Sequence, residues 1–174
     1  MRRISLNARL ALDAIATDEI EVVLLHIEHE DLAEPIRLST DSTERLSTEP
    51  LFYGTRSTWR GANPATQPFL WVIASTLLPS DLDDAPAAAT IILENLDHTM
   101  ADIVRSFTTP ATFHIAVVLA DTPNQIEAEF ADLLLTSSEI TAGEISLSIS
   151  REEIENEIVP GGRMSTRTFM GMHK

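Results

Sequence analysis

The sequence contains no cysteine among its 174 residues, and its six glycines are widely scattered. Without cysteine there are no disulfide bonds, iron–sulfur ligands, thiolate zinc sites or cysteine nucleophiles. The glycines form no phosphate-binding loop, and no serine lies on a tight glycine-flanked turn. We therefore expect a protein that is not an enzyme and that carries no cofactor.

Positive charge is also scarce, with 12 Lys and Arg against 27 Asp and Glu and a formal net charge of −15. Phosphate contacts require clustered Lys and Arg, so nucleic-acid specificity is not expected. No stretch reaches the ~18 uninterrupted apolar residues that a membrane helix needs. Asn7, Arg9 and Asp13 interrupt the apolar region that a signal peptide would need, so synthesis in the cytoplasm is the default expectation.

The composition is that of a folded chain, because 44% of the residues are hydrophobic. The length suits one domain with extensions, since domains most often hold ~100–150 residues. We predict an N-terminal helix within residues 1–18, capped by Ser5 or Asn7, and a β-rich domain over residues 19–158. An extended, locally cationic tail would follow over residues 159–174.

Alternating and β-branched segments predict roughly seven to nine strands and two or three short helices. The predicted strands are residues 19–29, 36–39, 51–53, 69–74, 87–94, 113–120, 127–136, 138–141 and 144–150. In the last of these, Ile145, Leu147 and Ile149 share one face. This order predicts a mainly β fold, a β-barrel or sandwich with one short packed helix.

The packed helix is predicted over residues 98–107, with Asp97 as its cap. Its apolar stripe is expected to be buried against the strands at residues 19–29 and 113–120. The residues expected in that contact are Met100, Ile103, Val104 and Phe107 with Val23, Leu25, Val117 and Leu119. A second short helix is expected at residues 151–158.

An unusual aromatic segment lies between the strands, because residues 41–78 are irregular and hold both tryptophans and the one tyrosine. One interpretation is a long loop with Trp59 tucked back on the core. The other is an extended arm that contacts a neighbouring subunit, since aromatic residues and arginine anchor interfaces. The candidate inter-subunit contacts are Phe52, Tyr53, Trp59 and Trp71 in this segment and Arg163, Arg167 and Lys174 in the tail.

The best metal-like group is the run from His26 to Asp31. His26 and Glu28 would share a strand face while His29 points away, and two ligands do not complete a site. The prediction is a solvated strand end entering a turn, with His114 at a strand start. No metal site is expected.

Four segments together resemble an uncharacterised family of tail proteins from tailed bacteriophages and prophages with long, non-contractile tails. They are the hairpin at residues 20–37, the strand, turn and helix at residues 89–105, the Pro-Ala-Thr strand at residues 110–119, and the Pro-Gly-Gly-Arg region at residues 152–171. The same order is similar to the hub domain of the minor tail protein L family and to hub proteins of gene transfer agents. Residues 41–78 are longer than, and differ from, the family pattern. The iron–sulfur extension of those relatives does not carry over, because cysteine is absent.

The resemblance implies a structural virion protein of the tail tip or baseplate, a distal tail or hub ring. Its partners would be further copies of itself, the tail tube or distal tail protein, and the hub or fibre protein. A ring of six copies is favoured over three, because the tail tubes of this phage class are six-fold and the chain shows one domain and no internal repeat. The protein would be made in the bacterial host cytoplasm and carried in the virion. The alternative is a β-sandwich module that recognises host-surface saccharide or peptide through Tyr53, Trp59 and Trp71.

Overall fold

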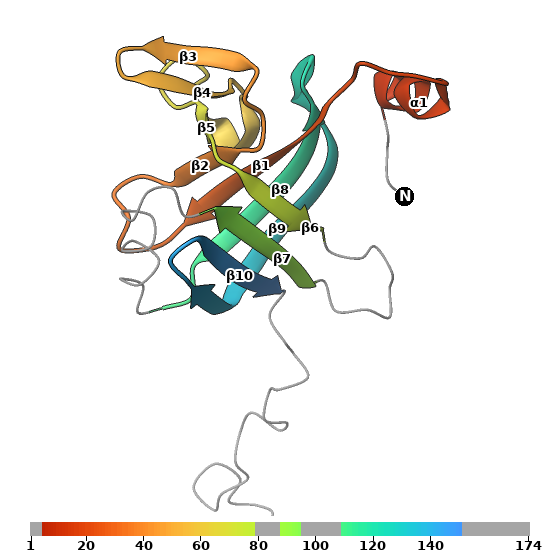
Figure 1. Ribbon diagram of the computed structural model, residues 1–174. Helices are drawn as coiled ribbons and strands as arrows, with labels where there is room; N and C mark the ends of the chain where they lie inside the picture. The colour runs from red at the N-terminus through yellow and green to blue at the C-terminus, as the bar shows by residue number, and fades with distance from the viewer. Residues whose placement is uncertain (1–4, 79–87, 95–108, 151–174) are drawn as a thin grey trace, which may run out of the picture.

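The computed structural model describes residues 5–78, 88–94 and 109–150, and this part of the chain is mainly β (Figure 1). The predicted fold class is therefore confirmed. The predicted helices at residues 98–107 and 151–158 and the cationic tail lie outside the described residues.

Ten strands, one α-helix and one 3-10 helix make up the described residues. Their bounds are α1 Leu6–Asp13, β1 Glu21–Glu28, β2 Ile36–Ser39, β3 Glu44–Thr48, β4 Leu51–Thr55, η1 Trp59–Gly61, β5 Phe69–Trp71, β6 Ala74–Leu77, β7 Ala88–Glu94, β8 Thr112–Leu119, β9 Thr122–Ile140 and β10 Glu144–Ser150. Of the two predicted caps of the first helix, Ser5 is the one observed, since its Oγ accepts from the Ala8 N–H at 3.0 Å. The predicted strands at residues 127–136 and 138–141 are halves of one long strand, β9, whose pairing with β8 and β10 shifts register at bulges.

The strands pair in the order β3-β4-β5-β2-β1-β8-β9-β10-β7-β6. All neighbours are antiparallel except β2 and β5, which are parallel. The centre of the sheet is the pair of β1 and β8, in which Val23 lies opposite Val117 and His26 opposite His114. Strands that are distant in sequence therefore form the middle of the sheet.

The sheet closes on itself through β5 and β6, which are two halves of one nearly continuous run. β5 pairs with β2, and β6 pairs with β7. At the join, the Val72 N–H donates to the Ser39 carbonyl at 2.9 Å, and the Glu94 N–H donates to the Ile73 carbonyl at 2.9 Å. This run connects β2 to β7 across the front of the molecule (Figure 1), so of the two predicted architectures the strands form a barrel.

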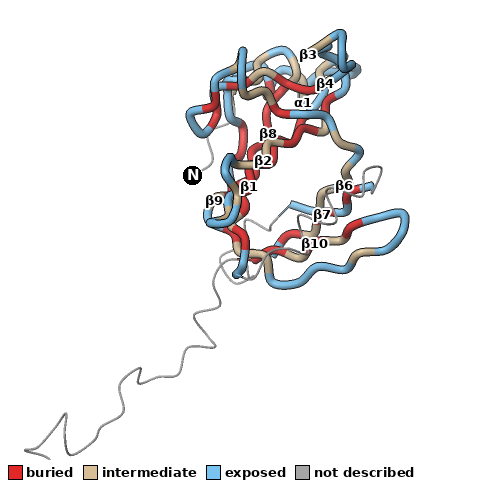
Figure 2. The backbone as a smooth tube through the Cα atoms, turned by 90° about the vertical axis from the view of Figure 1, so that its left-hand side faces the viewer, coloured by how far each residue is buried: buried red, intermediate tan, exposed pale blue. Residues whose placement is uncertain are grey.

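The barrel interior is an apolar core supplied by alternate residues of β1, β2, β7, β8, β9 and β10. Figure 2 shows buried residues where the two sides of the barrel face each other. The predicted shared face of Ile145, Leu147 and Ile149 on β10 is confirmed, and it points into the barrel, because these residues are at most 1% exposed. The interior side chains include Leu25, Ile27, Leu38, Ile91, Leu93, Phe113, Ile115, Val117, Phe130, Leu133, Ile145, Leu147 and Ile149.

A second core lies on the outer side of β1 and β8. Val22 and Leu24 of β1 and Ala116 and Val118 of β8 are fully buried there, under the segment at residues 59–69. That segment contributes Trp59, Ala62 and Phe69.

The expectation of an extended loop at residues 41–78 is therefore wrong, although the strands predicted within it at residues 51–53 and 69–74 are present as β4 and β5. The segment contains β3, β4, β5 and β6 and folds back over the barrel. The physical reason is that β1 and β8 are apolar on both sides, so their outer side needs an apolar cover. Gly54 makes the close approach of β4 to β5 feasible, because a Cβ there would lie 2.0 Å from the Phe69 carbonyl oxygen.

Candidate functional site

Two buried histidines lie side by side on the outer side of the barrel, beside the second core. His26 of β1 and His114 of β8 are direct cross-strand partners, and their ring centroids are 5.9 Å apart. Their exposed fractions are 2% and 1%. The prediction of a solvated strand end at His26 is wrong, because the alternation that buries Val22 and Leu24 places His26 under the same cover.

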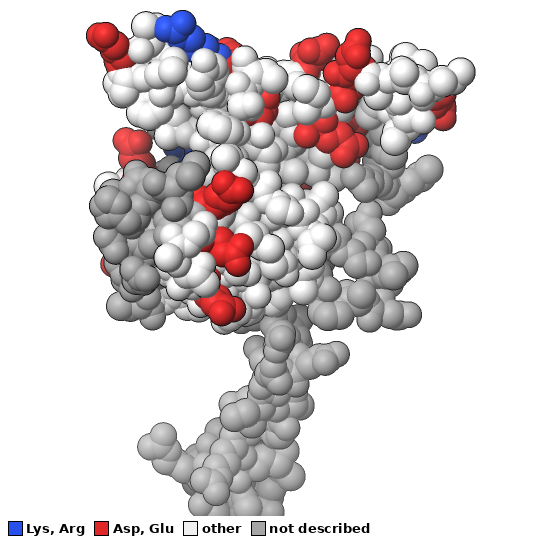
Figure 3. Space-filling model, viewed as in Figure 1, with Lys and Arg blue, Asp and Glu red and all other residues white. Residues whose placement is uncertain are grey.

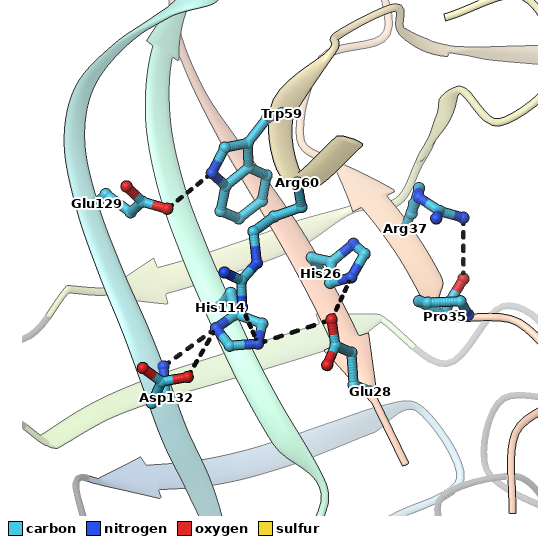
Figure 4. Close-up of polar contacts among 9 residues, drawn as sticks. All are labelled: His26, Glu28, Pro35, Arg37, Trp59, Arg60, His114, Glu129 and Asp132. Atoms are coloured by element: carbon cyan, nitrogen blue, oxygen red, sulfur yellow. Dashed lines mark hydrogen bonds and ion pairs between the residues drawn. The ribbon is translucent and has the colours of Figure 1, made fainter. Parts of the chain in front are cut away.

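The 3-10 helix η1 supplies that cover with Trp59 and Arg60 (Figure 4). The Trp59 ring lies edge-on to His26 at 6.1 Å between centroids and is stacked on Phe69 at 5.8 Å. Its indole N–H donates to Glu129 Oε1 of β9 at 2.9 Å. The Arg60 guanidinium contacts Nε2 of His114. The two side chains thus close the site from one short turn.

Two carboxylates complete the site. Glu28 Oε1 lies 2.9 Å from His26 Nε2 and 3.9 Å from His114 Nε2, so it faces both rings. On the other side, the Asp132 N–H donates to His114 Nδ1 at 3.0 Å, and its Oδ1 lies 3.8 Å from the same nitrogen. His114 is therefore held at both ring nitrogens.

Unusual backbone conformations converge on His114. Arg60 has φ 55° and Asp132 has φ 57°, and within the described residues these are the non-glycine positions with positive φ. The left-handed region costs L-residues roughly 1–2 kcal/mol, so surrounding contacts must hold both residues in place. The site is therefore defined by tertiary structure rather than by local preference.

The electrostatics favour neutral imidazole rings. Burial lowers the pKa of His26, and its hydrogen bond with Glu28 opposes part of that shift. Burial also lowers the pKa of His114, and the positive charge of Arg60 adds to the effect. Across the described residues, no group of three or more His, Asp or Glu side chains is arranged to hold a metal ion. The Arg60 guanidinium lies beside both rings and the Arg37 guanidinium also acts on His26, so these positive charges oppose proton uptake by the pair.

The stability of the fold should accordingly fall in mild acid. Both histidines have a pKa below 6.5, the ordinary value, so the unfolded chain takes up protons first as the pH drops below about 6.5. Their contribution is fully present above that pH and is lost as the pH falls toward the folded pKa values. Protonated rings would also face Arg60 and each other. Urea unfolding measured from about pH 7.5 to about pH 5, a range that spans the ordinary histidine pKa, determines the loss.

A matched pair of variants isolates the contribution of the buried rings. His26→Gln removes one titrating ring of the pair, so the decline in unfolding free energy with falling pH should become shallower. His29→Gln removes a histidine of the neighbouring turn, outside the pair, and serves as the control. An unchanged decline in His26→Gln would show that other groups cause the acid sensitivity.

A separate feature of the surface is an apolar patch on the outer side of β5, β6 and β7. Val72 and Ala74 pack against the barrel interior, so Ile73 between them points outwards. Four large side chains are uncovered on this side, and we call them the β6 face. They are Trp71, Ile73, Leu77 and Ile92, exposed by 40, 38, 69 and 36%.

The predicted inter-subunit contact residues differ in their solvent exposure. Phe52 and Trp71 are exposed, Tyr53 is half-buried, and Trp59 is only 6% exposed. Trp59 therefore belongs to the core of its own chain, as the first of the two interpretations had it, and is withdrawn as a surface contact. Arg163, Arg167 and Lys174 lie outside the described residues.

Sequence reasoning missed both the histidine pair and most of the β6 face. The pair had a signal, since His26 continues the alternation of Val22 and Leu24, and His114 lies within an apolar strand. The β6 face had none, because β6 is only four residues long.

No protein-family model and no curated protein matches this sequence. Of the helices within the described residues, none is both long enough and apolar enough to cross a membrane.

Proposed function

We propose that the protein is a structural subunit of the tail tip or baseplate of a long-tailed bacteriophage. In this proposal it forms a ring that links the tail tube or distal tail protein to the central hub and fibre. It is made in the cytoplasm of the bacterial host and carried in the virion. The phage setting comes from the sequence resemblance, and the role in assembly is supported by the surface of the barrel.

The observation that carries the assembly role is the β6 face. Contiguous exposed apolar side chains rimmed by polar groups mark interaction sites on soluble proteins. Trp71, Ile73, Leu77 and Ile92 lie on one side of adjacent strands, in a chain with a formal net charge of −15. A large aromatic and three aliphatic side chains are the residue types found at the centres of protein interfaces.

The alternative function, recognition of a saccharide or peptide, required Tyr53, Trp59 and Trp71 to share a surface. Trp59 is enclosed between Phe69 and His26, so it does not reach solvent beside the other two. The histidine pair is buried under Trp59 and Arg60, so it adds no exposed group to such a surface. The geometry therefore supports assembly better than ligand capture.

The test is genetic and structural. Deleting the gene from the phage or prophage genome should give particles whose tail tubes lack a tip, and wild-type protein supplied in trans should restore them. The Ile73→Glu variant should fail to restore tips, whereas Leu51→Glu, which changes an exposed leucine of β4, should succeed. Normal infectious tails after deletion would refute the proposal. Particle reconstructions should count six copies, and three would correct the number without removing the role.

A further inference from the structure

The N-terminal helix α1 has an apolar side that none of the described residues covers. Leu6 and Leu10 lie one turn apart on the same side of the helix and are 71 and 60% exposed, and Leu12 is 69% exposed. Ala8 is the buried residue of this helix. Figure 1 shows α1 set apart from the barrel, at the end of a connecting segment. An isolated helix of eight residues is marginal in water, so α1 gains most from a surface to pack against.

Residues 1–13, which include α1, carry three arginines against one acid in an acidic protein. Arg2, Arg3 and Arg9 precede Asp13, whereas the whole chain has a net charge of −15. Arg9 is exposed on α1, beside the side that bears Leu6 and Leu10. The segment therefore combines the two properties, apolar and positive, that an acidic apolar surface would bind.

The β6 face is such a surface. Glu94 follows Ile92 on β7 and is hydrogen-bonded through its backbone to Ile73. Glu94 lies directly opposite Glu144 of β10, and both are exposed. Figure 3 shows acidic side chains running down this side of the molecule. Like charges opposite one another across two strands are destabilising, so a cation placed between them would be favourable.

Helix α1 does not pack on the β6 face of its own chain. The N-terminus of α1 is fastened to β9, because the Ser5 N–H donates to Glu127 Oε2 at 2.8 Å. In the sheet, β10 and β7 lie between β9 and β6. Docking within one chain would therefore break this anchor, whereas a second copy can present its face without any rearrangement.

We propose that α1 of one copy packs on the β6 face of a second copy, with its leucines on Ile73 and Leu77 and Arg9 beside the Glu94–Glu144 pair. This inference rests on the proposed function, in which the β6 face is an assembly surface. It adds that the segment bound there is helix α1 of another copy. The two surfaces are unlike, so the contact is head-to-tail, the kind that closes into a ring.

The absence of cysteine makes a direct test feasible, because an introduced cysteine is the sole thiol in the chain. Full-length Leu10→Cys protein is mixed with full-length Ile73→Cys protein and treated with a short bismaleimide. The mixed dimer should form at a yield about tenfold above that of a control mixture. In the control, Leu51→Cys replaces Ile73→Cys, since Leu51 is 56% exposed on β4, away from the face. Equal yields in the two mixtures would overturn the proposal.

Charge reversal gives an independent check. Adding Glu94→Lys to the Ile73→Cys protein should lower the yield of mixed dimer several-fold, and adding Arg9→Glu to the Leu10→Cys protein should restore it. If the double charge reversal gave no higher yield of mixed dimer than the single reversal, Arg9 would not lie at the contact. The proposed packing of α1 on the β6 face would then be wrong.

Two other outcomes also overturn the inference. One chain that carries both cysteines and crosslinks internally, with no excess of dimer, would show that α1 binds its own barrel. Flotation of the Leu10→Cys protein with phosphatidylcholine and phosphatidylglycerol vesicles, without preferential crosslinking, would show a membrane-binding helix. The crosslinking uses purified protein, so its failure is distinct from normal tails after gene deletion, which would refute the proposed function instead.

Discussion

Replacing Trp59 with alanine is expected to lower the free energy of unfolding by about 3–5 kcal/mol, the range typical of truncating a buried tryptophan. The indole is 6% exposed, stacks on Phe69 and donates a hydrogen bond to Glu129. Its loss would leave a cavity over the outer side of β1 and β8 and would uncover His26. Urea unfolding monitored by circular dichroism measures the change.

The other tryptophan provides the control. Trp71 is 40% exposed on the β6 face, so Trp71→Ala should cost less than about 1 kcal/mol, as surface substitutions usually do. Trp59→Phe should fall between the two, because it keeps apolar contact but loses the N–H donor to Glu129. Equal losses at Trp59 and Trp71 would mean that residues 59–69 do not form a second core.

Replacing Phe113 with alanine should destabilise the protein by a similar amount, about 3–5 kcal/mol, through the other core. Phe113 is 1% exposed, points into the barrel from β8, and lies opposite Ile27 and Leu133 on the flanking strands. Few neighbours can move to fill the space, because both flanking strands are fixed by the closed sheet.

Phe52→Ala is the matched control for this second prediction. It removes the same side chain from a position on β4 that is 46% exposed, so the expected loss is below about 1 kcal/mol. Comparing the two variants separates burial in the barrel from the general effect of losing a phenylalanine. A small loss at Phe113 would contradict a closed, well-packed interior.

The strands that sequence reasoning located are those with a strong local pattern. β1, β7, β8 and β10 are seven or eight residues long, with alternating or continuous apolar residues that predict a strand without reference to any partner. The inward side of β10 was predictable for the same reason. The helix predicted at residues 98–107 stays a prediction, because those residues are not described.

The elements that sequence reasoning missed depend on distant partners. β6 is four residues long, extends beyond the strand predicted at residues 69–74, and is held as a strand by antiparallel pairing with β7, in which Ser75 lies opposite Ile92. The histidine site likewise depends on the register that sets His26 opposite His114, and on η1, which delivers Arg60 in a left-handed conformation. No local pattern contains these pairings, so they follow from tertiary structure alone.

The closure of the barrel by β5 and β6 has a kinetic consequence. Glu21 pairs with Leu119, about 100 positions along the chain, so the central pairing forms only after a large loop has closed. The β5–β6 run pairs with both β2 and β7, so these strands must already be in place. Its pairing is therefore a late step of folding. Chains dominated by such non-local contacts fold in milliseconds to seconds. During synthesis, the barrel interior remains open to solvent until β10 has left the ribosome. Until then, repulsion between the negatively charged chains limits their aggregation.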